Sequence, residues 1–229
     1  MKNNAIILAS VLLMSSPGWA GEKEIERLDN CRAVLDELAN GSEGIPRDLL
    51  DKSRCVIVIP GVKKAALGVG GRLGWGAAAC RTDGGGGPWG SPLMVSLKGG
   101  SFGFQIGGES SDFVLLVMDP KGIDHLLSNK FTLGADVSVA AGPVGRNAEA
   151  ATDVSLHAEI LSYSRSRGIF AGVSLEGASL ALDKKGNYEV YHDRVTPRDL
   201  ATRAGLDVPT AGRRLTEALQ KLSPRRASD

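Results

Sequence analysis

FTLGADVSVAAGPVGRNAEAATD, residues Phe131–Asp153, is the stretch from which the rest of the chain can be interpreted. An apolar side chain occupies every second position at its start, while small or polar residues lie between them; the apolar positions are Phe131, Leu133, Ala135, Val137, Val139 and Ala141. This period of two predicts a half-buried β-strand of roughly eleven residues over 131–141. Gly142–Gly145 then ends the strand. The stretch contains no nucleophile–base pair and no group of metal ligands, so it indicates a β-rich scaffold rather than a catalytic loop.

Other strand-like segments lie on both sides of this stretch, and helical patterns lie at the two ends of the chain. The alternating segments 93–97, 102–106 and 169–182, together with apolar runs such as 55–60 and 113–118, bring the total to roughly nine or ten strands. Glu22–Asn40 and Thr210–Leu222 carry apolar residues at helical spacing. We therefore expect one α+β domain over residues 21–229. It would be a rolled, mainly antiparallel sheet or a partly open barrel, with N- and C-terminal helices.

Residues 1–20 have the features of a secretory signal peptide. Lys2 supplies the positive start, and the apolar run Ala5–Met14 is too short to span a bilayer. Gly18 and Ala20 are the small residues that precede a cut before Gly21. We expect an exported protein, periplasmic or extracellular, that associates with a membrane only peripherally.

Three cysteines, Cys31, Cys55 and Cys80, allow one disulfide in an oxidising compartment. Cys55 opens the run CVIVIP, and Cys80 closes the run GWGAAAC. A hairpin that turned near Gly68 would set these two cysteines opposite each other, so Cys55–Cys80 is the predicted pair. No CxxC or Cys/His spacing of a zinc site occurs. We expect neither a metal nor a cofactor.

The net charge of +1 comes from 27 basic and 26 acidic residues, which is not the basic excess of a nucleic-acid-binding protein. Region 61–100 nevertheless contains one acid, Asp83, and five basic residues, namely Lys63, Lys64, Arg72, Arg81 and Lys98. Trp75 and Trp89 lie in the same region. Indoles favour the lipid–water boundary and clustered cations attract anionic headgroups, so this region can bind a membrane. The alternative is that the tryptophans are core anchors and the charges a solvated edge, and the residues alone favour this alternative.

The segment Gly99–Gly103, GGSFG, matches the G-x-S-x-G pattern of hydrolases. That motif requires a strand, a sharp turn and then a helix, whereas the following FGFQIGG alternates like a strand. The three histidines, His125, His157 and His192, are isolated from one another in the sequence. We therefore predict no catalytic residues and no enzymatic activity.

Several long segments, in order, resemble the SYLF domain family. They are Val62–Arg81, Trp89–Pro92, Gly99–Asp112, Phe131–Arg146 and Ser162–Gly177, and the likeness covers about residues 44–191. The chain looks like the exported, bacterial branch of that family. The resemblance implies binding of membrane lipids (phosphoinositides in eukaryotes), binding of actin in some members, and no catalysis. In animal members an N-terminal amphipathic helix contributes basic and apolar residues to lipid binding. Here Glu22–Asn40 holds six acidic and three basic residues, so region 61–100 is the expected site instead.

We therefore expect a non-enzymatic protein of the bacterial cell envelope that binds phospholipid through an anionic, phosphoinositide-like headgroup. The predicted lipid-binding residues are Lys63, Lys64, Arg72, Trp75, Arg81 and Trp89. The expected partner is an anionic membrane lipid or a lipid-like ligand, and neither nucleic acid nor actin is expected in this compartment. The alternative is a structural or protein-interaction module of the envelope without a lipid ligand.

Overall fold

A computed structural model describes most of the chain after the predicted signal peptide. The described residues are 21–40, 44–128, 130–145, 158–166, 168–192, 195–203 and 205–224. The predicted signal peptide, residues 1–20, therefore lies outside the described residues. No described helix is both long enough and apolar enough to cross a membrane.

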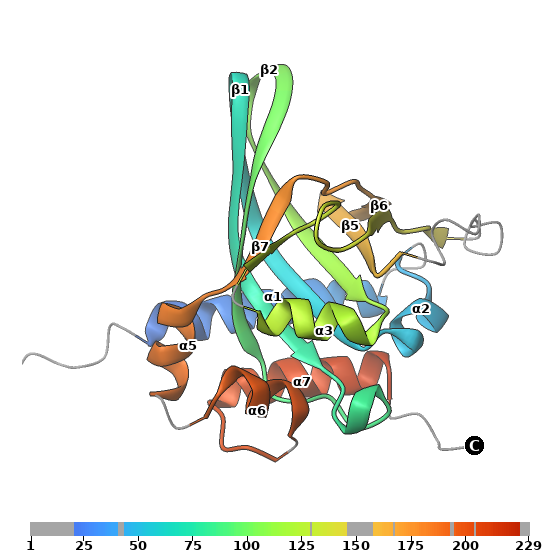
Figure 1. Cartoon of the computed structure of the whole chain (residues 1–229), viewed down its shortest axis with the longest axis vertical. Coiled ribbons are helices and arrows are strands. Elements are labelled where there is room, and N and C mark those ends of the chain that lie inside the picture. Colours follow the sequence, from blue (N-terminus) through green and yellow to red (C-terminus); the bar gives the residue numbers. More distant parts are fainter. Residues whose placement is uncertain are drawn as a thin grey trace, which may run out of the picture.

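The centre of the fold is a long antiparallel ribbon of two strands. Strand β1 (Cys55–Cys80) pairs with β2 (Leu93–Val117) almost from end to end, from Cys55 opposite Val117 to Ala78 opposite Leu93. A straight strand of that length would extend roughly 80 Å. The Cα atoms of Cys55 and Cys80 are nevertheless 3.9 Å apart. The ribbon therefore folds back on itself, and its bent end projects beyond the rest of the molecule (Figure 1).

The bend divides β1 into a first half, residues 55–66, and a second half, residues 68–80, at a shift in register between Ala66 and Gly68. Glycines let the two halves approach each other closely. A Cβ atom added to Gly74 would lie 2.6 Å from Cγ2 of Val62, and one added to Gly76 would overlap the carbonyl oxygen of Val58. Side chains at these positions would force the two halves apart.

The remaining strands extend the sheet from the two halves of β2, which lies in the middle of a seven-stranded sheet of order β3-β7-β2-β5-β4. Residues 95–99 of β2 pair with β7 (Ala178–Leu182), which pairs in turn with β3 (Lys130–Thr132). Residues 112–117 pair with β5 (Ile160–Ser166), which also carries β6 (Ile169–Gly172) and β4 (Val139–Ala141). Only the β4–β5 pair is parallel among these described ladders. The sheet curls into a half-barrel, which confirms the predicted α+β fold.

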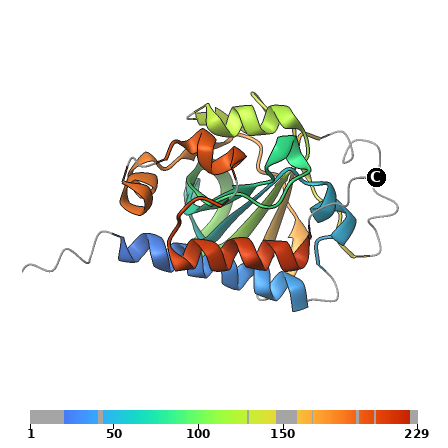
Figure 2. The ribbon, with the colours of Figure 1, turned by 90° about the horizontal axis from the view of Figure 1, so that it is seen from below.

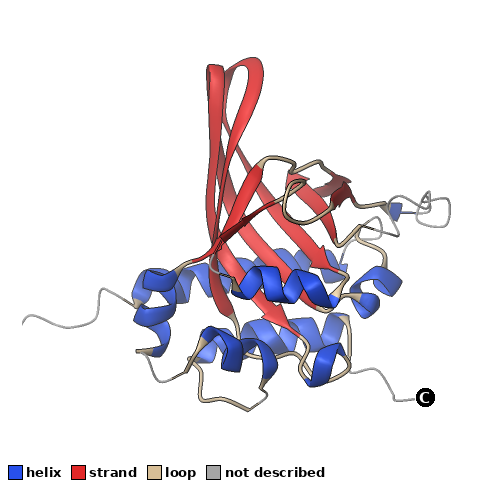
Figure 3. Ribbon diagram, in the orientation of Figure 1, coloured by secondary structure: helices blue, strands red, loops and turns tan. Residues whose placement is uncertain are grey.

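The helices gather at the end of the sheet opposite the bent ribbon (Figure 3). They are α1 (Glu22–Asn40), α2 (Arg47–Lys52), the 3₁₀ turn η1 (Asp83–Gly85), α3 (Pro120–Leu127), α5 (Lys184–Tyr191), α6 (Pro197–Thr202) and α7 (Thr210–Leu222). The terminal helices α1 and α7 have the predicted bounds and lie side by side (Figure 2). Asp119 caps α3 by accepting a hydrogen bond from the backbone N–H of Lys121 at 2.8 Å.

The predicted eleven-residue strand over 131–141 is wrong. Two three-residue strands, β3 and β4, replace it, because the chain turns between them. Gly134 has a φ of +82°, which favours glycine, and the backbone N–H of Thr132 donates to Oδ2 of Asp136 at 2.6 Å. Phe131, Leu133 and Val137 are buried, but Ala135 in the turn is exposed, so the apolar alternation of the sequence does not correspond to one continuous strand.

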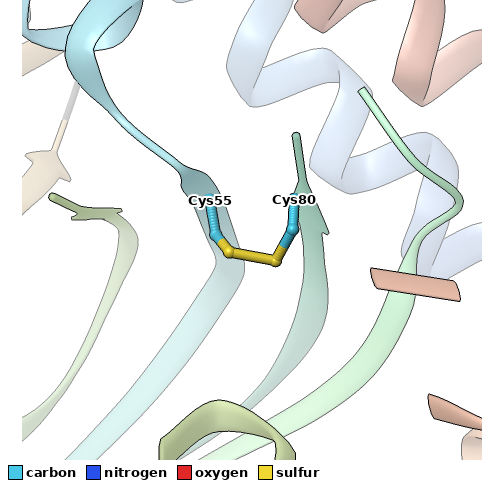
Figure 4. Close-up of a disulfide and its surroundings, with 2 residues drawn as sticks. All are labelled: Cys55 and Cys80. Carbon is cyan, nitrogen blue, oxygen red and sulfur yellow. A yellow bond between two sulfur atoms is a disulfide. The ribbon is translucent and has the colours of Figure 1, made fainter. Parts of the chain in front are cut away.

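A disulfide joins Cys55 to Cys80, the pair favoured by the sequence, and fastens the two ends of β1 together (Figure 4). The expected turn near Gly68 exists, but the two halves of β1 form their hydrogen-bonded ladders with β2 instead of with each other. Cys31 remains a fully buried free thiol, and burial raises its pKa to about 12.

Removing the disulfide with Cys55→Ala and Cys80→Ala should lower the free energy of unfolding by about 3 kcal/mol, because the unfolded chain then regains the freedom of the closed loop. Urea denaturation followed by circular dichroism measures this change. Reductant should destabilise the wild-type protein by a similar amount and leave the double variant unchanged. Equal stability of the oxidised and reduced wild-type protein would contradict the prediction.

Candidate functional site

The six residues predicted to bind lipid do not form one patch. Arg81 and Trp89 are buried, with 2 % and 3 % of their surfaces exposed. Lys64 and Arg72 line one pocket between the two halves of the ribbon. Trp75 is 44 % exposed and lines a different pocket. Lys63 is exposed and, because side chains alternate along a strand, lies on the face opposite that of its neighbour Lys64.

Arg81 and Trp89 hold the base of the fold together. The guanidinium carbon of Arg81 lies 4.2 Å from the centre of the Trp89 ring, a cation–π contact. The carbonyl oxygen of Ser223, just after α7, accepts hydrogen bonds from Nη2 of Arg81 at 3.2 Å and from Nε1 of Trp89 at 2.9 Å. The Ser223 hydroxyl donates to Oδ1 of Asp51 in α2 at 2.5 Å. The prediction that Arg81 and Trp89 face a membrane is therefore wrong, because these contacts bury both side chains.

The outer face of the second half of β1 carries an exposed apolar pair. Trp75 lies opposite Ser96, Ser96 opposite Ala181, and Ala181 opposite Lys130, so one row crosses four strands. Directly opposed residues share a face of the sheet. The next row on that face runs through Leu73, Lys98, Ser179 and Thr132. Leu73 is 38 % exposed, and Lys98 and Lys130 are exposed beside it.

A pocket of about 390 Å³ opens on this face. Its lining includes Trp75, Lys98, Lys130 and Lys184. We call these four residues and the neighbouring Leu73 the outer basic face. The lining acid, Asp183, is already engaged: it accepts from Nη1 of Arg27 at 2.7 Å and from the backbone N–H of Gly186 at 3.0 Å. None of the three lysines has an ion pair or a side-chain hydrogen bond with a described residue. The outer basic face therefore has an excess of positive charge.

The pocket between the ribbon halves, about 190 Å³ in volume, has a different composition. Lys64 and Arg72 supply its charge, and Ser111 and Ser164 supply hydroxyls. Val62, Phe113 and Val173 form its apolar walls. Burial lowers the pKa of Arg72, although its guanidinium remains a cation near neutral pH. We call this the ribbon pocket.

Gly99–Gly103 lies inside β2, and not at the turn between a strand and a helix that the G-x-S-x-G motif requires. The side chain of Ser101 itself lies outside the described residues. His125 packs against Phe131 and His192 against Tyr188, with ring centres 5.9 and 6.0 Å apart. No group of three or more possible metal ligands occurs in the part of the chain that the structure describes.

Comparison with known proteins gives the family. The description "Ysc84: Las17-binding protein actin regulator" matches residues 98–222. The chain belongs to the Ysc84 family, the SYLF domain family that its sequence resembles. The Ysc84 description refers to binding and regulation and names no reaction.

Three relatives show the extent of the similarity to this Ysc84-family chain. "Protein YSC84" of Saccharomyces cerevisiae is 31 % identical over 188 residues, which is 81 % of this chain and 39 % of that protein. "LAS seventeen-binding protein 3" of the same yeast is 32 % identical over 71 % of this chain and 36 % of its own length. Human "SH3 domain-containing YSC84-like protein 1" is 33 % identical over 68 % of this chain and 45 % of its own length. The chain thus spans less than half the length of each of these relatives.

Sequence reasoning missed part of the outer basic face. Lys98 belongs to the basic region 61–100 but is not among the six predicted residues, and neither are Leu73, Lys130 and Lys184. Lys130 and Lys184 are distant from Trp75 in the sequence and meet it only because β3 and β7 add to the sheet beside β2. The local sequence signal available was the spacing of Leu73 and Trp75, which are two residues apart and so lie on one face of a strand.

Arg81→Met should lower the free energy of unfolding by roughly 2–3 kcal/mol, because buried acceptors lose their charged donor. The matched control Lys63→Met, at an exposed position, should change it by less than about 0.5 kcal/mol. Urea denaturation measures both. A stable Arg81→Met protein that had lost lipid binding would contradict the structural role.

Proposed function

We propose that this protein binds anionic phospholipid at a membrane surface and catalyses no reaction. The observation that carries the proposal is the outer basic face. Two exposed apolar side chains, Leu73 and Trp75, lie there beside lysines that no described acid neutralises. An indole at the lipid–water boundary and lysines at the headgroups are a complementary pair of contacts.

The expected free energies of the individual contacts favour a membrane attachment made of several weak contacts. Each lysine near an anionic surface contributes about 1 kcal/mol, so the three lysines Lys98, Lys130 and Lys184 together give a modest, salt-sensitive attraction. Leu73 and Trp75 add apolar area that enters the interfacial region, a contribution that salt does not screen. Reversible, peripheral binding is the expected result.

The alternative is that the same face binds a protein. The family description names Las17 binding and actin regulation, and one yeast relative is called a Las17-binding protein. An exposed apolar pair within a polar rim also suits a protein interface. In this alternative the chain is a structural or interaction module of the envelope that has no lipid ligand.

Flotation with vesicles separates these functions. Wild-type protein should float with vesicles of phosphatidylcholine and phosphatidylglycerol and much less with phosphatidylcholine alone. Lys98→Glu with Lys130→Glu should reduce the floated fraction at least tenfold, because two attractive charges become repulsive. The control pair Lys52→Glu and Lys221→Glu makes the same charge change on α2 and α7, and we expect it to retain most of the binding.

Salt and Trp75→Ala complete the test. Raising salt from 50 to 500 mM (about a threefold shorter screening length) should release the wild-type protein from vesicles. Trp75→Ala should weaken binding at every salt concentration, because its contribution is apolar. Absence of flotation by the wild-type protein at low salt, or equal loss in the control pair, would remove lipid as the ligand and favour a protein partner.

We also propose that the protein is exported and acts in the cell envelope. The proposal rests on the signal-like residues 1–20 and on the Cys55–Cys80 disulfide, which suits an oxidising compartment. Expression of the full chain in a bacterium and mass spectrometry of the periplasmic fraction should give a protein that begins at Gly21. An uncleaved protein in the cytoplasm would contradict export. Actin would not be a partner in this compartment.

A further inference from the structure

We infer that the ribbon pocket binds a phosphate group, either free phosphate or the phosphomonoester of a lipid headgroup. Lys64 comes from the first half of β1 and Arg72 from the second half, so the fold-back of the ribbon creates the pocket. Ser111 lies opposite Val62, and Ser164 lies opposite Phe113 in the adjacent ladder, so both serines are on the face of the sheet that lines the pocket. Two cations and two hydroxyls thus line one small cavity.

The charges in the ribbon pocket lack a counter-ion among the side chains that the structure describes, which do not include those of residues 101–109. Neither Lys64 nor Arg72 forms an ion pair there, and the buried Nε of Arg72 has no hydrogen-bond partner. The nearby acid Asp112 is occupied on the other face of β2 by Arg165 at 2.8 Å and by the backbone N–H of Gly61 at 2.8 Å. Glu109 lies opposite Lys64 in the register. One carboxylate would still leave one of the two cations uncompensated.

Shape and chemistry select phosphate from among the possible anions. A volume of about 190 Å³ is below the usual range for drug-sized ligands, so it suits a small group rather than a nucleotide or an acyl chain. The guanidinium of Arg72 offers a planar fork that matches two phosphate oxygens. Lys64 adds a point charge, and the hydroxyls of Ser111 and Ser164 can donate to the remaining oxygens. The polar residues of the described lining thus match the donors that a tetrahedral phosphate accepts from.

Titration calorimetry of the full protein with inorganic phosphate tests this inference. We expect saturable binding that Lys64→Gln or Arg72→Gln weakens by roughly tenfold or more, as the loss of a charged hydrogen bond implies. Lys63→Gln is the matched control: it removes the same charge one residue away on the opposite face, and its affinity should stay within twofold of wild type. Absence of saturable binding, or equal weakening by Lys63→Gln, would overturn the inference.

Thermal unfolding separates a binding role from a structural role. In phosphate-free buffer, Arg72→Gln should melt no lower than the wild-type protein, because the variant loses a half-buried cation that has no described counter-charge. Phosphate should raise the melting temperature of the wild-type protein and of Lys63→Gln but not that of Arg72→Gln. A marked fall in the melting temperature of phosphate-free Arg72→Gln would make this residue structural and overturn the inference.

Vesicles distinguish the two sources of phosphate. Phosphatidic acid carries a phosphomonoester, whereas phosphatidylglycerol carries a phosphodiester. If the source is a headgroup, wild-type protein prefers phosphatidic acid vesicles, and Lys64→Gln removes that preference. If the source is free phosphate, calorimetric binding persists without such a preference. The pair Lys98→Glu and Lys130→Glu should retain phosphate binding, so failure of the proposed membrane contact can be recognised separately.

Discussion

The close contact between the two halves of β1 is the constraint on which the rest of the structure depends. Glycine at 74 and 76 lets the halves approach, since a Cβ at Gly76 would overlap the carbonyl oxygen of Val58. The Cys55–Cys80 disulfide then fastens the open end. Because β1 folds back, β2 must follow it, and the two halves of β2 pair with different strands, the first half with β7 and the second half with β5. The half-barrel is a consequence of this single fold-back.

The same fold-back creates two basic surfaces of different character. Side chains alternate along the second half of β1. Arg72 therefore faces the first half and lines the ribbon pocket with Lys64, whereas Leu73 and Trp75 lie on the outer face. The inner surface is small and half-buried, which suits one compact anion. The outer surface is broad and exposed, which suits many weak contacts with a membrane. One stretch of strand therefore contributes to both surfaces, although the two can be altered independently by mutation.

The sequence was sufficient for features that depend on neighbouring residues. Apolar spacing indicated the bounds of α1 and α7. Features that depend on distant residues were missed or mistaken. Burial of Arg81 and Trp89 depends on Ser223, more than 130 residues away, and the row from Trp75 to Lys130 depends on how β7 and β3 join the sheet. The sequence around Gly134 alternates as a strand would, but the chain turns there and Ala135 is exposed.

The packing and charge of α1 are reasons to expect anionic ligands to bind the sheet instead of this helix. Its buried face, including Leu28, Cys31 and Leu35, packs against the core, and α7 lies along it. Its acids serve internal contacts: Asp29 accepts from Arg214 of α7 at 2.6 Å, and Glu37 pairs with Arg165 of β5. Lifting α1 onto a membrane would expose this apolar face and break these ion pairs. With six acids and three bases, the helix would also be repelled by an anionic surface. In this chain α1 therefore stabilises the scaffold, and the basic side chains of β1, β2 and β3 remain available for an anionic ligand.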